Sequence, residues 1–209
     1  VFEERIDGGG ALESVVKADF GALAESVSAN GRYIALTHDD RRDRNDILVH
    51  DRENSETRPF LATQYDEDHP AFSPDGTLLA YAANDSGRSE VYVRPFPGPG
   101  GKYTISNHGG TGPVWSRDGR ELFYAEGDKL MRVGIERAPR FTATSPQILF
   151  ETPDFVWERV RNYDVLPDGS GFLATTDRAG SPVLELRDRD GSLVRTLLPD
   201  RRDFFALQS

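Results

Sequence analysis

Four histidines are the side chains of this sequence best suited to metal or acid–base chemistry: His38, His50, His69 and His108. Zinc sites draw several ligands together, often from closely spaced pairs along the chain. These four are few and scattered in the sequence, and the chain has no cysteine. The sequence therefore predicts neither a metal site nor a cofactor.

Two loops rich in carboxylates offer a different chemistry. Residues 38–46 and 84–90 each combine Asp or Glu with Asn, Ser or Arg. Clustered oxygen ligands can hold calcium, but neither loop has the ligand spacing of an EF-hand. Because arginines are interleaved with the acids, we expect solvated hairpin tips, which also discourage edge-to-edge aggregation.

The motifs of nucleophilic and phosphate chemistry are not found. The chain has no cysteine and no Gly-x-Ser-x-Gly elbow. The glycine-rich stretches 8–10 and 98–101 lack the Lys-Ser/Thr of a phosphate loop and read as hairpin loops. We therefore expect the isolated chain to have no hydrolase or phosphotransfer activity and not to be an enzyme.

A four-residue phrase of the sequence that is typical of a tight turn recurs four times, and it predicts the strands that position the histidines and the acidic loops. It reads Ser28-Ala29-Asn30-Gly31, Ser73-Pro74-Asp75-Gly76, Ser116-Arg117-Asp118-Gly119 and Leu166-Pro167-Asp168-Gly169. In each phrase Asp or Asn bonds its own backbone and Gly accepts a positive φ, so two strands reverse there. The glycines are 45, 43 and 50 residues apart, the spacing of four-stranded propeller blades.

Each turn is followed by strand-length apolar segments. The first are the nearly unbroken runs Tyr33–Leu36, Leu78–Tyr81, Leu122–Ala125 and Phe172–Thr175, which suit strands covered on both faces. A third strand is expected at 47–49, 91–93, 130–133 and 183–186, and a fourth at 58–61, 103–105, 147–150 and 193–197. Pro59 fits only an edge strand, and Phe72 and Trp115, just before their turns, are expected in the core.

The predicted fold class is therefore an all-β propeller of four-stranded antiparallel blades, with about four complete blades and a partial one. The blades are expected at 24–62, 63–106, 107–151 and 152–199, with outer strands of a partial blade in 1–23 and a tail or closing strand in 200–209. The first residue is not Met and half a blade is missing, so we expect a part of a longer protein. Either residues 203–207 close the ring, or the blades belong to a larger ring whose open edges allow self-association.

The composition of the chain limits the classes of partner that we expect it to bind. The 209 residues carry 25 basic and 35 acidic side chains, a net charge of −10, which repels a phosphate backbone. No stretch approaches the roughly 18 apolar residues of a membrane span, so neither nucleic acid nor membrane insertion is expected. The absence of cysteine fits the cytosol or a bacterial envelope compartment.

Several stretches resemble one known repeat. The TolB-type propeller repeat is similar to the segments 69–76, 79–81, 90–97 and 113–124. Taken together with 163–169, the sequences of these segments most closely resemble the propellers of bacterial Ser/Thr kinase sensor regions. The resemblance covers Phe60 to Thr175. The resemblance implies a ring of six or more blades. It also implies a periplasmic or other extracytoplasmic location in the bacterial cell envelope. Propellers of this kind mostly bind proteins or small ligands, and a minority are enzymes or gate an attached peptidase.

The predicted strand order also places candidate contacts. If the Asp-Gly turns share one face, the loops that enter each inner strand lie on the opposite face and converge on the mouth of the channel. Tyr65, His69, His108, Trp157 and Arg161 fall in or near these loops. Aromatic faces with polar tips suit a ligand pocket, and Trp157 is the best single anchor.

The sequence thus favours a non-catalytic propeller that binds a protein or small-molecule ligand at this mouth, as a binding or sensing module. The alternative is an enzyme or part of one. It would be a metal-dependent lyase with His69 and His108 as ligands, or the gating propeller of a peptidase whose hydrolase domain lies elsewhere.

Overall fold

The chain is built from strands and loops. The computed structural model describes residues 2–3, 13–14, 21–39, 44–151, 163–178 and 181–198, and the elements in these ranges are all β-strands. None of the described segments is a helix that could cross a membrane. The all-β expectation is therefore confirmed. The chain divides into two compact units, Val1–Thr104 and Ile105–Ser209.

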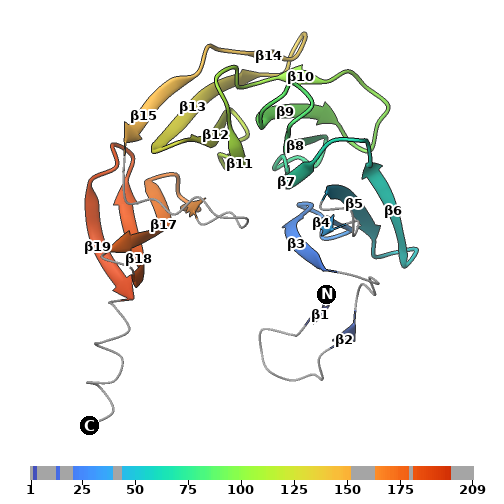
Figure 1. Ribbon diagram of the computed structural model, residues 1–209, viewed down its shortest axis with the longest axis horizontal. Coiled ribbons are helices and arrows are strands. Elements are labelled where there is room, and N and C mark those ends of the chain that lie inside the picture. The colour runs from blue at the N-terminus through green and yellow to red at the C-terminus, as the bar shows by residue number, and fades with distance from the viewer. Residues whose placement is uncertain are drawn as a thin grey trace. The chain divides into compact units, whose positions relative to one another are not determined.

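The first unit holds two four-stranded antiparallel sheets and a short pair of strands, labelled in chain order in Figure 1. The short pair is β1 (Phe2–Glu3) and β2 (Glu13–Ser14). One sheet has the order β3 (Ala22–Val27), β4 (Tyr33–Asp39), β5 (Asn45–Asp51), β6 (Glu56–Leu61). The next has the order β7 (Glu67–Phe72), β8 (Leu78–Ala83), β9 (Glu90–Pro95), β10 (Tyr103–Thr104). Pro59 lies on β6 at the edge of its sheet, as predicted.

The second unit repeats this order with one irregularity. Its first sheet runs β11 (Thr111–Trp115), β12 (Glu121–Glu126), β13 (Lys129–Glu136). The fourth position is split, because β14 (Thr142–Ala143) pairs with the end of β13 and β15 (Gln147–Glu151) with its beginning. The last sheet is β16 (Tyr163–Val165), β17 (Gly171–Arg178), β18 (Ser181–Asp188), β19 (Leu193–Leu198). The closing strand expected at 203–207 lies outside the described residues.

The recurring phrase forms the predicted turns, and its chemistry is visible at Ser73. The Ser73 hydroxyl donates to Asp75 Oδ1 at 2.7 Å, and the backbone N–H groups of Thr77 and Leu78 donate to Asp75 Oδ1 and Ser73 Oγ at 3.1 and 3.0 Å. Gly76 donates to the Ser73 carbonyl at 2.8 Å with φ +70°. These bonds hold the reversal between β7 and β8 in one conformation and account for the spacing of Ser, Asp and Gly.

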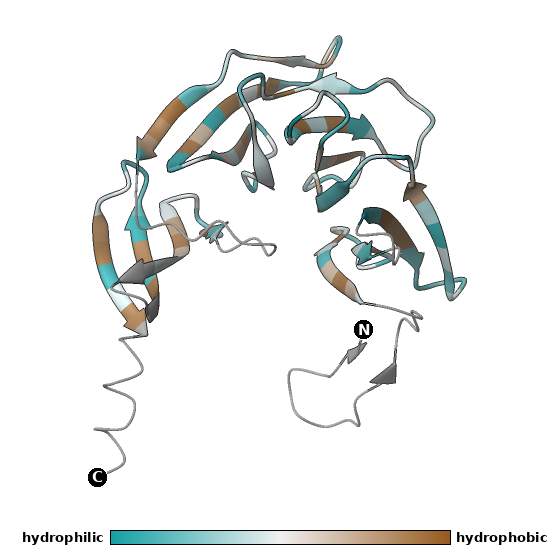
Figure 2. Cartoon of the chain, in the orientation of Figure 1, coloured by the Kyte–Doolittle hydropathy of each residue, from teal (hydrophilic) through white to brown (hydrophobic). Residues whose placement is uncertain are grey.

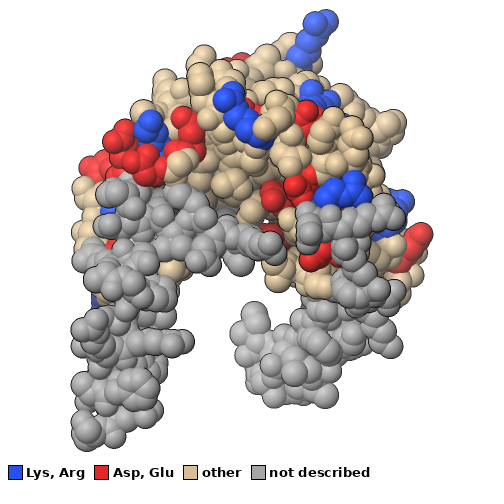
Figure 3. Space-filling model, in the orientation of Figure 1, with Lys and Arg blue, Asp and Glu red and all other residues tan. Residues whose placement is uncertain are grey.

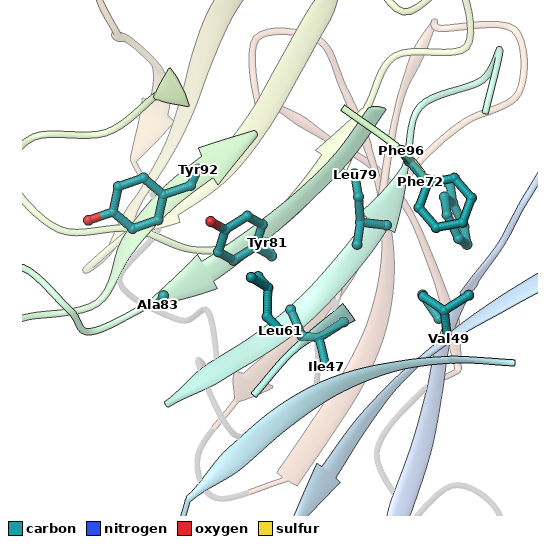
Figure 4. Packing of buried hydrophobic residues seen from close by; sticks show 10 residues of the cluster. Ile47, Val49, Leu61, Phe72, Leu79, Tyr81, Ala83, Tyr92 and Phe96 are labelled. Carbon is teal, nitrogen blue, oxygen red and sulfur yellow. The ribbon is translucent and has the colours of Figure 1, made fainter. Parts of the chain in front are cut away.

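The core of the first unit lies between its two four-stranded sheets. All six residues of β8 are buried, as the unbroken apolar run predicts, and hydrophobic residues of β4 and β5 share their cluster with residues of β7, β8 and β9. Figure 4 shows Phe72 and Phe96 side by side above Val49, and Tyr81 and Tyr92 at the other end of the cluster. Phe72 is only 7% exposed, so its predicted core position is confirmed.

A separate core joins the two sheets of the second unit. Phe123 of β12 meets the ring of Phe172 of β17 edge-on with centroids 5.2 Å apart, and Phe150 of β15 packs against the same ring at 5.6 Å. Trp115 is buried as expected. Along β13, hydrophobic residues are interspersed with hydrophilic ones (Figure 2), and Val133 and Ile135 are buried while Arg132 and Glu136 are not, which fits a strand with one covered and one more solvated face.

Candidate functional site

Hydrogen bonds join the β6–β7 loop to the start of β5 and to the β8–β9 loop at one end of the sheets of the first unit. Asp66 of the β6–β7 loop makes both links: its carboxylate accepts the backbone N–H of Asn45, the first residue of β5, at 3.1 Å and the amide of Asn84 at 2.7 Å. Asp66 N–H in turn donates to Asn84 Oδ1 at 3.0 Å. These contacts fix the β6–β7 and β8–β9 loops relative to one another.

The β6–β7 loop is held in place by Thr63 and Glu67. Both the N–H and the hydroxyl of Thr63 donate to the Glu67 carboxylate, the first at 3.3 Å. The same hydroxyl accepts the N–H of Tyr65 at 3.2 Å, and Arg44 Nη1 donates to the Thr63 carbonyl at 3.1 Å. The loop therefore has a defined shape while the Tyr65 side chain remains 38% exposed.

Glu67 is a buried carboxylate with an altered titration. Burial raises its pKa, and the negative charges of Asp46 and Asp85 raise it further, while the two hydrogen bonds from Thr63 act in the opposite direction. The net shift is upward because removal from water disfavours the charged form.

We therefore expect a pH-dependent contribution of Glu67 to stability. A group whose folded pKa is raised stabilises the fold when it is protonated, and this contribution is lost as the pH rises from the ordinary glutamate range through the folded pKa. Glu67→Gln keeps the shape and one acceptor without the charge. The difference in unfolding free energy, wild type minus variant, should fall as the pH rises above the ordinary glutamate pKa of about 4.3. Urea denaturation at several pH values measures it, and a difference independent of pH would contradict the assignment.

His69 lies in an irregularity of β7. The register of β7 on β8 shifts between Asp68 and Ala71, and His69 adopts a left-handed φ of +52° before Pro70. In the second unit Gly112 occupies the corresponding place, with φ +58° before Pro113 and a register shift of its own. Such bulges re-aim a side chain. The His69 imidazole is buried and its Nδ1 lies 2.8 Å from Asp68 Oδ1.

The other predicted contacts lie elsewhere in the chain. His108 is exposed and belongs to the second unit, in the segment before β11. Trp157 and Arg161 lie outside the described residues. His50 is buried on β5 and its Nδ1 lies 2.9 Å from Thr57 Oγ1, a structural contact.

Within the described ranges, no group of three or more His, Asp or Glu side chains could hold a metal ion. The acidic loop 84–90 is tied by ion pairs instead, since Arg88 Nε donates to Glu90 Oε1 at 2.6 Å and Lys102 bonds Asp85. On the face shown in Figure 3, acidic and basic side chains are interspersed, as expected of solvated hairpin tips.

The network around Asp66 was not anticipated from the sequence, although a signal for it exists. Glu67 of β7 pairs with Ala83 of β8, and this register places Asp66 opposite Asn84. The two residues are 18 positions apart. The sequence predicts the β7–β8 hairpin, and continuing its residue pairing to the ends of both strands places Asp66 opposite Asn84.

Solved structures with a similar fold include TolB and two enzymes. TolB from Acinetobacter baumannii superposes with a TM-score of 0.68 at 16% identity, over 90% of this chain and 45% of that one. A gluconolactonase from Xanthomonas campestris gives 0.67 at 15% identity, over 96% and 68%. An oligogalacturonate lyase in complex with manganese gives 0.61 at 13% identity, over 88% and 56%.

The chain thus spans about half the length of TolB. No protein-family profile matches the sequence. Identities this low are informative about the fold, and the shared fold agrees with the four antiparallel sheets and the repeat spacing. The chain has a TolB-like β-propeller fold.

Proposed function

We propose that this chain is a non-catalytic binding module whose contact surface is the end of the first unit formed by the β6–β7 and β8–β9 loops. The observation that carries the proposal is the order of the β6–β7 loop. Hydrogen bonds through Thr63, Asp66 and Glu67 hold it, yet it leaves Tyr65 exposed. A loop that is already ordered loses little conformational freedom on binding.

Tyr65 is suited to the role of an anchor. A tyrosine offers a large apolar face and one hydroxyl, and residues of this type dominate the binding energy of many interfaces. The strand that follows the loop carries the buried His69, whose Nδ1 lies 2.8 Å from Asp68 Oδ1. His108, Trp157 and Arg161 are proposed as further contacts from their places in the corresponding loops of the sequence. The proposed partner is a protein or small ligand of the bacterial cell envelope, outside the cytoplasm, as the resemblance to TolB-type repeats suggests.

A photo-crosslinking experiment tests the surface. The photoreactive amino acid p-benzoylphenylalanine is placed at position 65 and, as the matched control, at position 103. Tyr103 on β10 is exposed to nearly the same extent, 37% against 38%. Each protein is irradiated in a bacterial envelope extract. A discrete adduct formed from position 65 alone supports the proposal, whereas equal labelling from both positions contradicts it.

The adduct then allows a quantitative measurement. Tyr65→Ala is expected to weaken binding of the identified partner by about tenfold or more, because truncating an aromatic anchor typically costs over about 1 kcal/mol. Tyr103→Ala should leave the affinity unchanged. Both variants should unfold within about 0.5 kcal/mol of the wild type, as exposed substitutions do. Equal affinities of the two variants would rule out Tyr65 as the anchor.

An enzymatic role is the second candidate, because two structures of similar fold are described as a gluconolactonase and a manganese-bound lyase. The strained, buried His69 beside Asp68 is the observation that favours it, since such backbone conformations recur at functional sites. Stoichiometric metal in dialysed protein that is lost in His69→Ala would favour the lyase alternative over the binding module.

A further inference from the structure

The tripeptide Arg-Pro-Phe occurs twice in the first unit, at 58–60 on β6 and at 94–96 at the end of β9. The two copies belong to adjacent sheets. Phe60 and Phe96 approach with ring centroids 5.7 Å apart. Both copies line one groove of about 590 Å³, which Val49 and the loop 97–100 complete. This volume is in the range of pockets that take a small ligand or a few residues of a peptide.

Arg94 is held in a defined orientation. Its Nε donates to the hydroxyl of Tyr81 at 3.1 Å. Tyr81 is buried in the core between the sheets, and burial raises its pKa to about 12, so the hydroxyl stays neutral. The contact uses Nε and leaves the terminal nitrogens of the guanidinium available for a carboxylate, the geometry in which arginine binds best.

Arg58 supplies a second charge of the same sign. It is exposed on β6, where its backbone pairs with Val49, and its guanidinium forms no ion pair or hydrogen bond with the described residues. The register of β6 on β5 shifts at Phe60, between the pairs Ile47↔Leu61 and Leu48↔Pro59, and both Arg58 and Phe60 line the groove. The described residues that line the groove include these two arginines and no acidic side chain. On a chain with a net charge of −10, this is a local concentration of positive charge over an aromatic floor.

We propose that this groove binds an extended peptide segment of a protein partner, in which an apolar or aromatic side chain is flanked by aspartate or glutamate. The apolar side chain packs on Phe60 and Phe96, and the carboxylates pair with Arg58 and Arg94. Proline at 59, 95, 97 and 99 leaves the rim poor in backbone N–H donors, so side-chain contacts rather than strand addition select the segment. This surface is separate from the loop surface around Tyr65 and does not depend on it.

Selection from a displayed library of random dodecapeptides tests the proposal with the whole chain as bait. The double variant Arg58→Glu/Arg94→Glu serves for counter-selection. Arg120→Glu/Arg140→Glu is the matched control, with the same change in net charge at two exposed arginines of the second unit. Enriched sequences are expected to place Asp or Glu next to an apolar or aromatic residue.

Fluorescence polarisation of an enriched peptide completes the test. Arg58→Glu/Arg94→Glu should weaken its binding by more than about 30-fold, replacement of the peptide's acids by their amides by about tenfold, and the control double variant by less than about twofold. Arg58→Ala alone, which removes no internal hydrogen bond, should weaken binding measurably while the protein unfolds as the wild type does. Enrichment of neutral or basic peptides, full affinity in Arg58→Ala, or complete competition by millimolar acetate would overturn the proposal.

Discussion

Replacing Arg187 by alanine is expected to lower the free energy of unfolding by about 3–5 kcal/mol, because it removes the partner of a fully buried carboxylate. Glu185 on β18 is 0% exposed. Arg187 donates to Glu185 Oε2 from Nε and Nη2 at 3.1 and 2.6 Å, and its Nη1 donates to the Gly191 carbonyl at 2.8 Å. Without the guanidinium, the negative charge would remain in a site from which water is excluded.

A second substitution identifies the cause of this loss. Glu185→Gln in the Arg187→Ala background removes the buried charge and should recover part of the lost stability. Unfolding in urea, followed by circular dichroism, measures all three proteins. A loss below about 1 kcal/mol in Arg187→Ala, the size typical of a surface ion pair, would mean that solvent reaches the Glu185 carboxylate.

Phe96→Ala is expected to be equally severe, with a loss of about 3–5 kcal/mol, because it opens a cavity where three aromatic side chains meet. The Phe96 ring lies 5.0 Å from that of Tyr33, 4.8 Å from Phe72 and 5.7 Å from Phe60, measured between centroids. These rings come from β4, β7 and β6, so Phe96 joins the two four-stranded sheets of the first unit.

Matched variants separate packing from a general effect of truncation. Phe96→Leu keeps most of the volume and should cost no more than about 1.5 kcal/mol. Ile148→Ala truncates a side chain that is 51% exposed on β15, and a change within about 0.5 kcal/mol is expected. If Phe96→Ala and Ile148→Ala proved similar, the contact between the two sheets would not depend on Phe96.

The turns and inner strands could be predicted because their causes are local. Ser73, Asp75 and Gly76 form their bonds with backbone groups within five residues, so the sequence of the turn contains nearly all of its chemistry. The run that begins at Leu78 is buried along its length because it is apolar throughout. The core positions of Phe72 and Trp115 followed from their place just before a turn.

The fourth strand of the sheet that begins with β11 is split into β14 and β15. This split could not be predicted from local sequence in the same way. Thr142–Ala143 has no apolar pattern, and it pairs only with Ile135 and Glu136 at the far end of β13. The bond from Gly134 N–H to Thr144 Oγ1, at 2.9 Å, extends this contact. A two-residue strand of this kind depends on the length of its partner, which the sequence of the strand does not contain.

The sequence by itself determined the fold class, the repeat and the positions of the four recurring Asn/Asp-Gly turns, because hydrophobic periodicity and turn chemistry act over a few residues. The tertiary structure decided which polar side chains meet. Asp66 reaches Asn84 through strand register, and Glu67 is buried by the loop that it holds. The two Arg-Pro-Phe copies face one groove only because adjacent sheets pack through Phe96. Such contacts join residues far apart in the chain, and their formation depends on the packing of whole sheets.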